Sequence, residues 1–162
     1  MKLVWTGGAL VVALVLQSTL GILVPGEARI VDPFLLVVVY CGLVGGETHG
    51  MLAGMAAGWV QDIHFGGPVA GLSGLTKLLV GFGVGVAGSR FLVVGTAPRL
   101  LVLFAASLAD AILFERLALV FELPLSSLTI LSLLGRATAN ALAGAVLFEL
   151  AEMRFRRREV RL

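Results

Sequence analysis

Three ionisable side chains stand inside long apolar stretches of the sequence, where a charge is costly. Lys77, Asp110 and Arg136 each lie well inside such a stretch. If these stretches are membrane helices, Lys77 and Arg136 lie roughly 9 and 12 Å from the ends at which their helices enter. Asp110, on a helix that enters from the opposite face, lies roughly 12 Å from that same outer face. We therefore expect the three charges to meet at one depth in the outer half of the membrane.

Other polar residues reach a comparable depth. A charge that faces lipid costs several kcal/mol, so a shared cluster is the favourable arrangement. We expect two bases, Lys77 and Arg136, to be neutralised by two acids, Asp110 and Asp62. The predicted cluster comprises Gln17, Asp62, Lys77, Asp110, Arg136 and Asn140. Three uses remain open: a structural network that fixes helix register, a cavity for a ligand or ion, and a lipid-headgroup site near the cations.

The residue types that usually carry catalysis do not form a recognisable set. His49 and His64 fall on opposite sides of the membrane in a six-span arrangement, so they cannot share a metal. Cys41 has no histidine at ligand spacing, and the serines lack a Ser-His-Asp set at one depth. We expect no enzymatic activity, no metal and no cofactor.

The elements that must position these residues follow from composition. The chain has 162 residues, of which 59% are hydrophobic and 14% are charged. Soluble domains are less apolar and carry about 25% charged residues. Six helices of about 20 residues would use most of the chain. We predict an all-α, polytopic integral membrane protein, a six-helix bundle forming one transmembrane domain over residues 1–162. The expected spans are 3–24, 33–46, 50–63, 71–89, 98–121 and 128–150.

The second and third expected spans are short for a bilayer core of about 30 Å. They could extend through Glu47 and His49, sit in a thinned bilayer, or form a re-entrant pair. Basic residues set the orientation. Five arginines lie in the tail 151–162, which predicts a cytoplasmic tail. With six spans both termini share the cytoplasmic side. No folded basic domain accompanies the tail, so nucleic-acid binding is not expected.

Glycines recur at helical spacing in the third and fourth expected spans. Gly50, Gly54 and Gly58 fall on one face, and Gly81 and Gly85 repeat the pattern. In lipid, small residues at every fourth position let two helix backbones approach closely. The pattern predicts either tight pairing of these two spans or contact with a partner helix.

The middle of the chain resembles a known family. The segments that carry the resemblance are Asp32-Pro33-Phe34 through Tyr40, Gly50-x-x-x-Gly54, Gly58-Trp59-Val60-Gln61-Asp62, Gly66-Gly67-Pro68, Gly71-Leu72-Ser73-Gly74-Leu75 and Val80-Gly81-Phe82. Their order, over about residues 32–85, resembles the bacterial rod-shape-determining protein MreD family. Trp59 and Phe82 replace the usual Leu and Tyr, and the charge of Lys77 is not part of the family pattern. Asp62 is the only charged residue carried over from the matched motif.

The resemblance implies a location and a role. It implies a multi-pass protein of the bacterial cytoplasmic (inner) membrane, with both termini cytoplasmic. The implied function is that of a non-enzymatic scaffold in the cell-elongation (rod) complex, which supports lateral peptidoglycan synthesis and rod shape. Its implied partners are membrane lipids, an MreC-like single-span protein and, indirectly, a RodA-like polymerase, a penicillin-binding transpeptidase and an MreB-like filament. The family is also similar in fold to the S components of energy-coupling-factor vitamin transporters. The alternative is therefore a membrane subunit that binds a small molecule.

Overall fold

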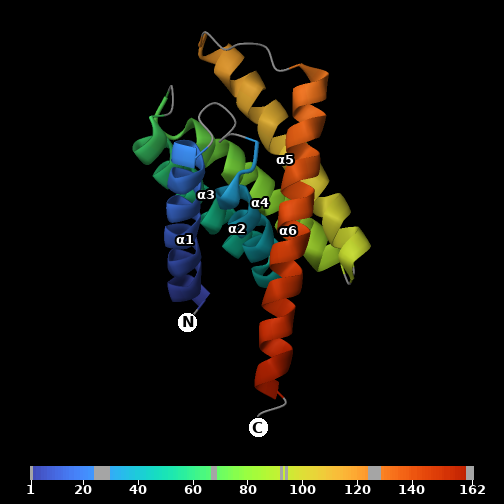
Figure 1. Ribbon diagram of the computed structural model, residues 1–162. Helices are drawn as coiled ribbons and strands as arrows, with labels where there is room; N and C mark the ends of the chain where they lie inside the picture. The colour runs from blue at the N-terminus through green and yellow to red at the C-terminus, as the bar shows by residue number, and fades with distance from the viewer. Residues whose placement is uncertain are drawn as a thin grey trace.

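The regular structure of the described residues is entirely helical. The structure is a computed structural model that describes residues 2–23, 30–66, 69–91, 93, 95–123 and 129–159, with the backbone alone for 2, 3 and 151–159. Its helices are α1 (Lys2–Leu23), α2 (Pro33–Gly45), α3 (Glu47–Phe65), α4 (Leu72–Arg90), α5 (Thr96–Val120) and α6 (Ile130–Glu159). These six helices, drawn in Figure 1, confirm the predicted all-α class within the described part of the chain.

Three of the described helices are long and apolar enough to cross a membrane. They are the segments Val4–Leu23, Leu72–Arg90 and Ile130–Leu150. The first residues of α1 and the last helical residues of α6 lie at the same end of the bundle (Figure 1). Two expected boundaries change. α3 includes Glu47 and His49, and α6 continues through much of the region expected as a tail, to Glu159.

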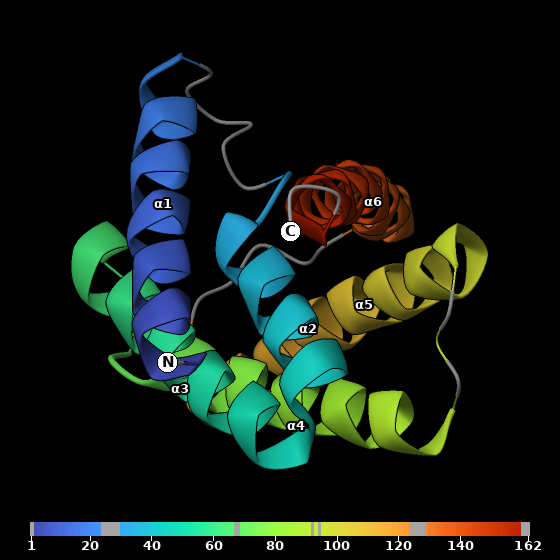
Figure 2. The same cartoon turned by 90° about the horizontal axis from the view of Figure 1, so that it is seen from below.

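The short helix α2 is the centre of the bundle. It contacts each of the other five helices, and Figure 2 shows α1 and α6 on either side of it. Its apolar residues surround the helix, as expected for a helix buried on all sides. Asp32 caps its first turn and Pro33 occupies its first position, where a missing N–H costs nothing. Gly46, with φ of 82°, is the only residue between α2 and α3.

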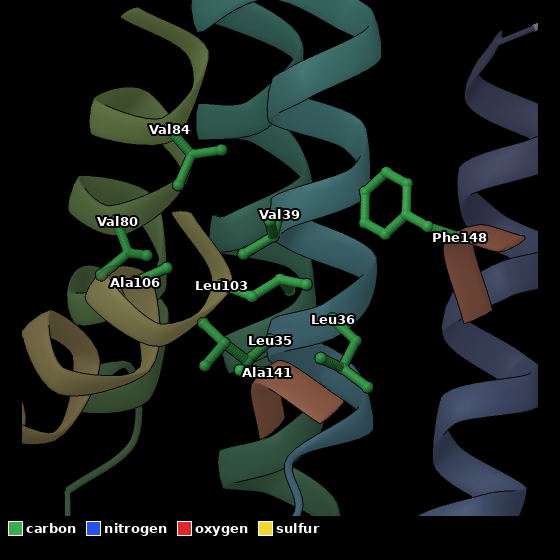
Figure 3. Close-up of a cluster of buried hydrophobic side chains, with 9 residues drawn as sticks. All are labelled: Leu35, Leu36, Val39, Val80, Val84, Leu103, Ala106, Ala141 and Phe148. Atoms are coloured by element: carbon green, nitrogen blue, oxygen red, sulfur yellow. The ribbon is translucent and has the colours of Figure 1, made fainter. Parts of the chain in front are cut away.

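Apolar side chains from four helices meet beside α2. Figure 3 shows this core, to which α2, α4, α5 and α6 contribute side chains. Its buried members are Leu35, Leu36, Val39, Val80, Val84, Leu103, Ala106, Ala141 and Phe148. A second cluster joins α1, α2 and α3 through Leu10, Ala13, Phe34, Val38 and Ala57. Together the two clusters link α2 to each of the other five helices.

The glycines of α3 and α4 form one antiparallel interface. A Cβ added to Gly58, Gly54 or Gly50 would overlap the backbone carbonyl of Ser73, Lys77 or Gly81, respectively. A Cβ on Gly81 would overlap the carbonyl of Gly50, and one on Gly85 would overlap the backbone of Glu47. The contact thus repeats every turn along both helices. The glycines therefore form the predicted contact between these two helices. Because α3 and α4 cover each other's glycine faces, a partner helix cannot bind there.

Candidate functional site

A buried lysine lies between two buried aspartates. Lys77 Nζ lies 2.7 Å from Asp32 Oδ2 and 3.2 Å from Asp110 Oδ2. The lysine is 2% exposed, and the two aspartates are 5% and 8% exposed. The ion pairs join α4 to the start of α2 and to the middle of α5. Lys77 and Asp110, two members of the predicted cluster, are thus in contact.

Asp32 is held by more than its ion pair. Its Oδ1 accepts a hydrogen bond from the backbone N–H of Leu35 at 3.1 Å. Its Oδ2 accepts a longer bond of 3.5 Å from Gln61 Nε2 of α3. As the capping residue of α2 it also lies at the positive end of that helix. Each of these contacts stabilises the ionised carboxylate.

Asn140 ties α6 to the same cluster. Its side-chain oxygen accepts a hydrogen bond from the backbone N–H of Asp32 at 2.8 Å. Its Nδ2 donates to Ser107 Oγ of α5 at 2.9 Å and to the Ile30 carbonyl at 3.4 Å. Asn140 is almost fully buried, so these bonds replace the ones that water would make. The cluster therefore takes side chains from five helices, α2 to α6.

Asp62 has a different role from the one predicted. Its Oδ2 accepts hydrogen bonds from the backbone N–H groups of Gly71 at 2.9 Å and Ser73 at 3.0 Å. These two groups begin α4, which has no side-chain cap of its own at Gly71. Asp62 is thus the acceptor for the free N–H groups at the start of α4. Its carboxylate stabilises a helix end and does not neutralise Lys77.

Arg136 and Gln17 also depart from the predicted cluster. Arg136 is half-buried, and among the described residues no ion pair links it to Asp110 or Asp62. Gln17 is buried on α1, and its Oε1 has no hydrogen-bond partner among the described residues. The expected balance of two bases against two acids is therefore wrong. The cluster pairs one base with two acids and carries a formal charge of −1.

Sequence reasoning missed Asp32, which is not among the residues of the predicted cluster. Two signals could have identified it. An aspartate directly before a proline at the start of an apolar run is typical of a helix cap. In addition, a helix of 13 residues spans only about 20 Å, so if it entered a bilayer core of about 30 Å, one of its ends would lie in the interior. Gln61 was missed for the same reason, because its partner is Asp32.

The two histidines lie near opposite ends of α3 and contact α1. His49 Nε2 lies 2.9 Å from Thr6 Oγ1, and His64 Nε2 lies 3.5 Å from Ser18 Oγ. The Thr6 hydroxyl is also 3.7 Å from Cys41 Sγ. Within the described residues, no group of three or more His, Cys, Asp or Glu side chains is placed to hold a metal. These contacts attach α1 to the central helices.

Comparison with known proteins yields no match. No protein-family model, no curated protein and no solved structure matches the chain.

Proposed function

We propose that this chain is a non-enzymatic membrane scaffold of the bacterial cell-elongation complex. In this proposal it lies in the cytoplasmic membrane with both termini in the cytoplasm. It binds an MreC-like single-span protein and thereby supports lateral peptidoglycan synthesis, with a RodA-like polymerase, a transpeptidase and an MreB-like filament as indirect partners. The resemblance over residues 32–85 is the starting point for this proposal.

The packing of α2 to α4 is the observation that best supports this proposal. The segment with the resemblance folds into a single unit, α2 to α4, in which its characteristic residues are used for internal support. Gly50, Gly54 and Gly58 pack against the backbone of α4, and Asp62 caps the start of that helix. Tight, repeated backbone contact makes a stiff unit, because such interfaces have little room to adjust. A stiff unit suits a protein whose work is to hold others in place.

A partner helix must then bind another surface. Large apolar side chains are exposed on the outer faces of α1, α3 and α6, among them Trp5, Ile63 and Leu131. Lipid covers such residues in a membrane, and a partner helix can replace lipid where shapes fit. We therefore place partner binding on one of these outer faces and not on the glycine faces.

Photo-crosslinking in the native host tests this proposal. A crosslinking amino acid is introduced separately at Trp5, Ile63 and Leu131, which lie on three different helices. We expect one face to crosslink to an MreC-like protein and the other two to serve as matched controls. Depletion of the chain should also make rod-shaped cells round. Normal cell shape after depletion, together with no crosslinked partner from any position, would refute the scaffold.

Reporter fusions test the proposed orientation separately. Green fluorescent protein fused to either terminus should fluoresce, because both termini are proposed to be cytoplasmic, and alkaline phosphatase at the same positions should be inactive. An active phosphatase at one terminus would mean an odd number of crossings. The vitamin-binding alternative is examined by equilibrium binding of labelled vitamins to the purified protein. Saturable binding of one vitamin would favour that alternative.

A further inference from the structure

The charges of the buried cluster do not balance. Asp32 and Asp110 each contribute a carboxylate, and Lys77 contributes the only ammonium group that contacts them among the described residues. All three side chains are buried. An uncompensated charge in a low-dielectric interior is strongly unfavourable, and such a group usually becomes neutral by gaining or losing a proton.

The cluster also has too few hydrogen-bond donors for its buried acceptors. Asp110 Oδ1 is buried and has no hydrogen-bond partner within the described part of the chain. Gln61 Oε1, whose amide nitrogen contacts Asp32, is a second buried acceptor without a described donor. Buried polar atoms are nearly always paired in folded proteins. The cluster therefore has an excess of acceptors as well as an excess of negative charge, and one added proton reduces both.

The surroundings of the two carboxyl groups decide where that proton goes. Asp32 has the shorter ion pair, two hydrogen-bond donors and the positive end of α2, all of which favour its ionised form. Asp110 lies in the middle of α5, away from either helix end, and its Oδ1 has no described donor. The ionised form of Asp110 is thus the less stabilised of the two.

We propose that Asp110 is a proton-binding site, which holds one proton as a neutral carboxylic acid while Asp32 and Lys77 remain an ion pair. The proton comes from water and adds to Oδ1, which leaves Oδ2 to accept from Lys77. The bound form is neutral overall. Release of the proton returns the net charge of −1 and places two carboxylates around one ammonium group, which weakens the junction of α4 and α5.

The groups around Asp110 come from each helix that packs on α5. α4 contributes Lys77, and α2 contributes Asp32. α6 contributes the neutral Asn140, with its hydrogen bond to Ser107, and the half-buried Arg136 one turn away. The position between the two carboxylates, where a monovalent cation would be expected to bind, is filled by the lysine ammonium. A proton is therefore the ligand that this site accommodates.

Infrared difference spectroscopy of the purified protein in detergent tests the proposal directly. A protonated carboxylic acid has a carbonyl stretch that is well separated from the carboxylate bands and shifts in heavy water. We expect this band at neutral pH in the wild type and in Asp62→Asn, the matched control, whose substituted residue lies outside the cluster. We expect it to be lost in Asp110→Asn, and also in Asp32→Asn, because Asp110 is then the remaining carboxylate beside Lys77 and ionises as its counter-ion. Asp110→Glu, which keeps the acid on a longer side chain, should shift the frequency of the band. Absence of the band in the wild type, its persistence in Asp110→Asn, or a shift in Asp32→Glu alone would overturn the proposal.

The pH dependence of thermal unfolding provides a second measurement. Because the folded wild type holds a proton that the unfolded chain releases at neutral pH, its melting temperature should fall as pH rises from acidic to neutral. Asp110→Asn, which mimics the neutral acid, should fold and lose that component of the slope. An unchanged slope in Asp110→Asn, or failure of this variant to fold at neutral pH, would contradict proton binding. A melting temperature that rises with sodium or potassium in the wild type alone would assign the site to a metal cation instead.

Discussion

Lys77 takes part in two contacts that hold the bundle together, an ion pair and a close backbone contact. Its ammonium group lies 2.7 Å from Asp32 Oδ2, at the start of α2, and its backbone carbonyl is the surface on which Gly54 of α3 packs. The same residue therefore positions α4 relative to α2 through charge and relative to α3 through close backbone contact. A change in either contact is expected to affect the other, because sites that share a residue are rarely independent.

Removal of the lysine charge should be the most damaging single change in the cluster. Lys77→Met keeps the length and apolar stem of the side chain but leaves the Asp32 carboxylate without a counter-charge. Loss of one partner from a buried ion pair typically costs about 3–5 kcal/mol. We expect a large fall in the melting temperature in detergent, measured by intrinsic fluorescence or light scattering.

The matched comparison for this prediction is Asp110→Asn. It removes a carboxylate but leaves the Asp32–Lys77 pair intact and neutral, so its loss of stability should be clearly smaller than that of Lys77→Met. The triple variant Lys77→Met, Asp32→Asn and Asp110→Asn should recover part of the loss, since it buries no charge. If Lys77→Met is as stable as the wild type, the lysine is not the group that neutralises Asp32.

The close packing of α3 on α4 predicts that alanine substitution will have different effects on stability at two glycines. Gly54→Ala adds a methyl group where the Lys77 carbonyl already lies, so α3 and α4 must move apart. Overpacking of this kind costs about 1–3 kcal/mol. We expect a lower melting temperature for Gly54→Ala and failure to fold for Gly54→Leu.

Gly83 provides the control for that interface. It lies on the outer face of α4, and a Cβ added there has no atom within 4 Å among the described residues. Gly83→Ala should therefore be neutral or stabilising by up to about 1 kcal/mol, as expected for alanine in a helix interior. Equal melting temperatures for Gly54→Ala and Gly83→Ala would show that α3 and α4 are not packed backbone to backbone.

The sequence predicted those members of the cluster, Lys77 and Asp110, whose contact follows from their positions along their helices. A fixed rise of 1.5 Å per residue was enough to bring Lys77 and Asp110 to one level, because both lie well inside helices. Depth could not decide the direction of a side chain. Arg136 lies one turn from Asn140, but its long stem allows the guanidinium group to leave the interior, whereas the short amide of Asn140 stays buried.

Asp32 shows why the remainder of the site was not predicted. It caps a helix of only 13 residues at the centre of the bundle, and the packing of that helix places its cap beside Lys77. Tertiary packing around α2 determines which end lies inside, and one sequence contains no direct signal for it. The assignment of Asp62 was wrong for a related reason, since the capping of α4 depends on how Gly71 and Ser73 return towards α3.

Asp62 is expected to act on the start of α4 and nowhere else. Asp62→Ala removes the acceptor for the Gly71 and Ser73 N–H groups, and loss of a helix cap costs about 0.5–2 kcal/mol. Hydrogen–deuterium exchange of the first turn of α4 should become faster. Asp62→Asn, which keeps an acceptor oxygen, should restore most of the protection. Because Asp62 lies outside the charge cluster, neither variant should alter the acid band assigned to Asp110. A loss of that band in Asp62→Ala with unchanged exchange at Gly71 and Ser73 would place the carboxylate in the cluster after all.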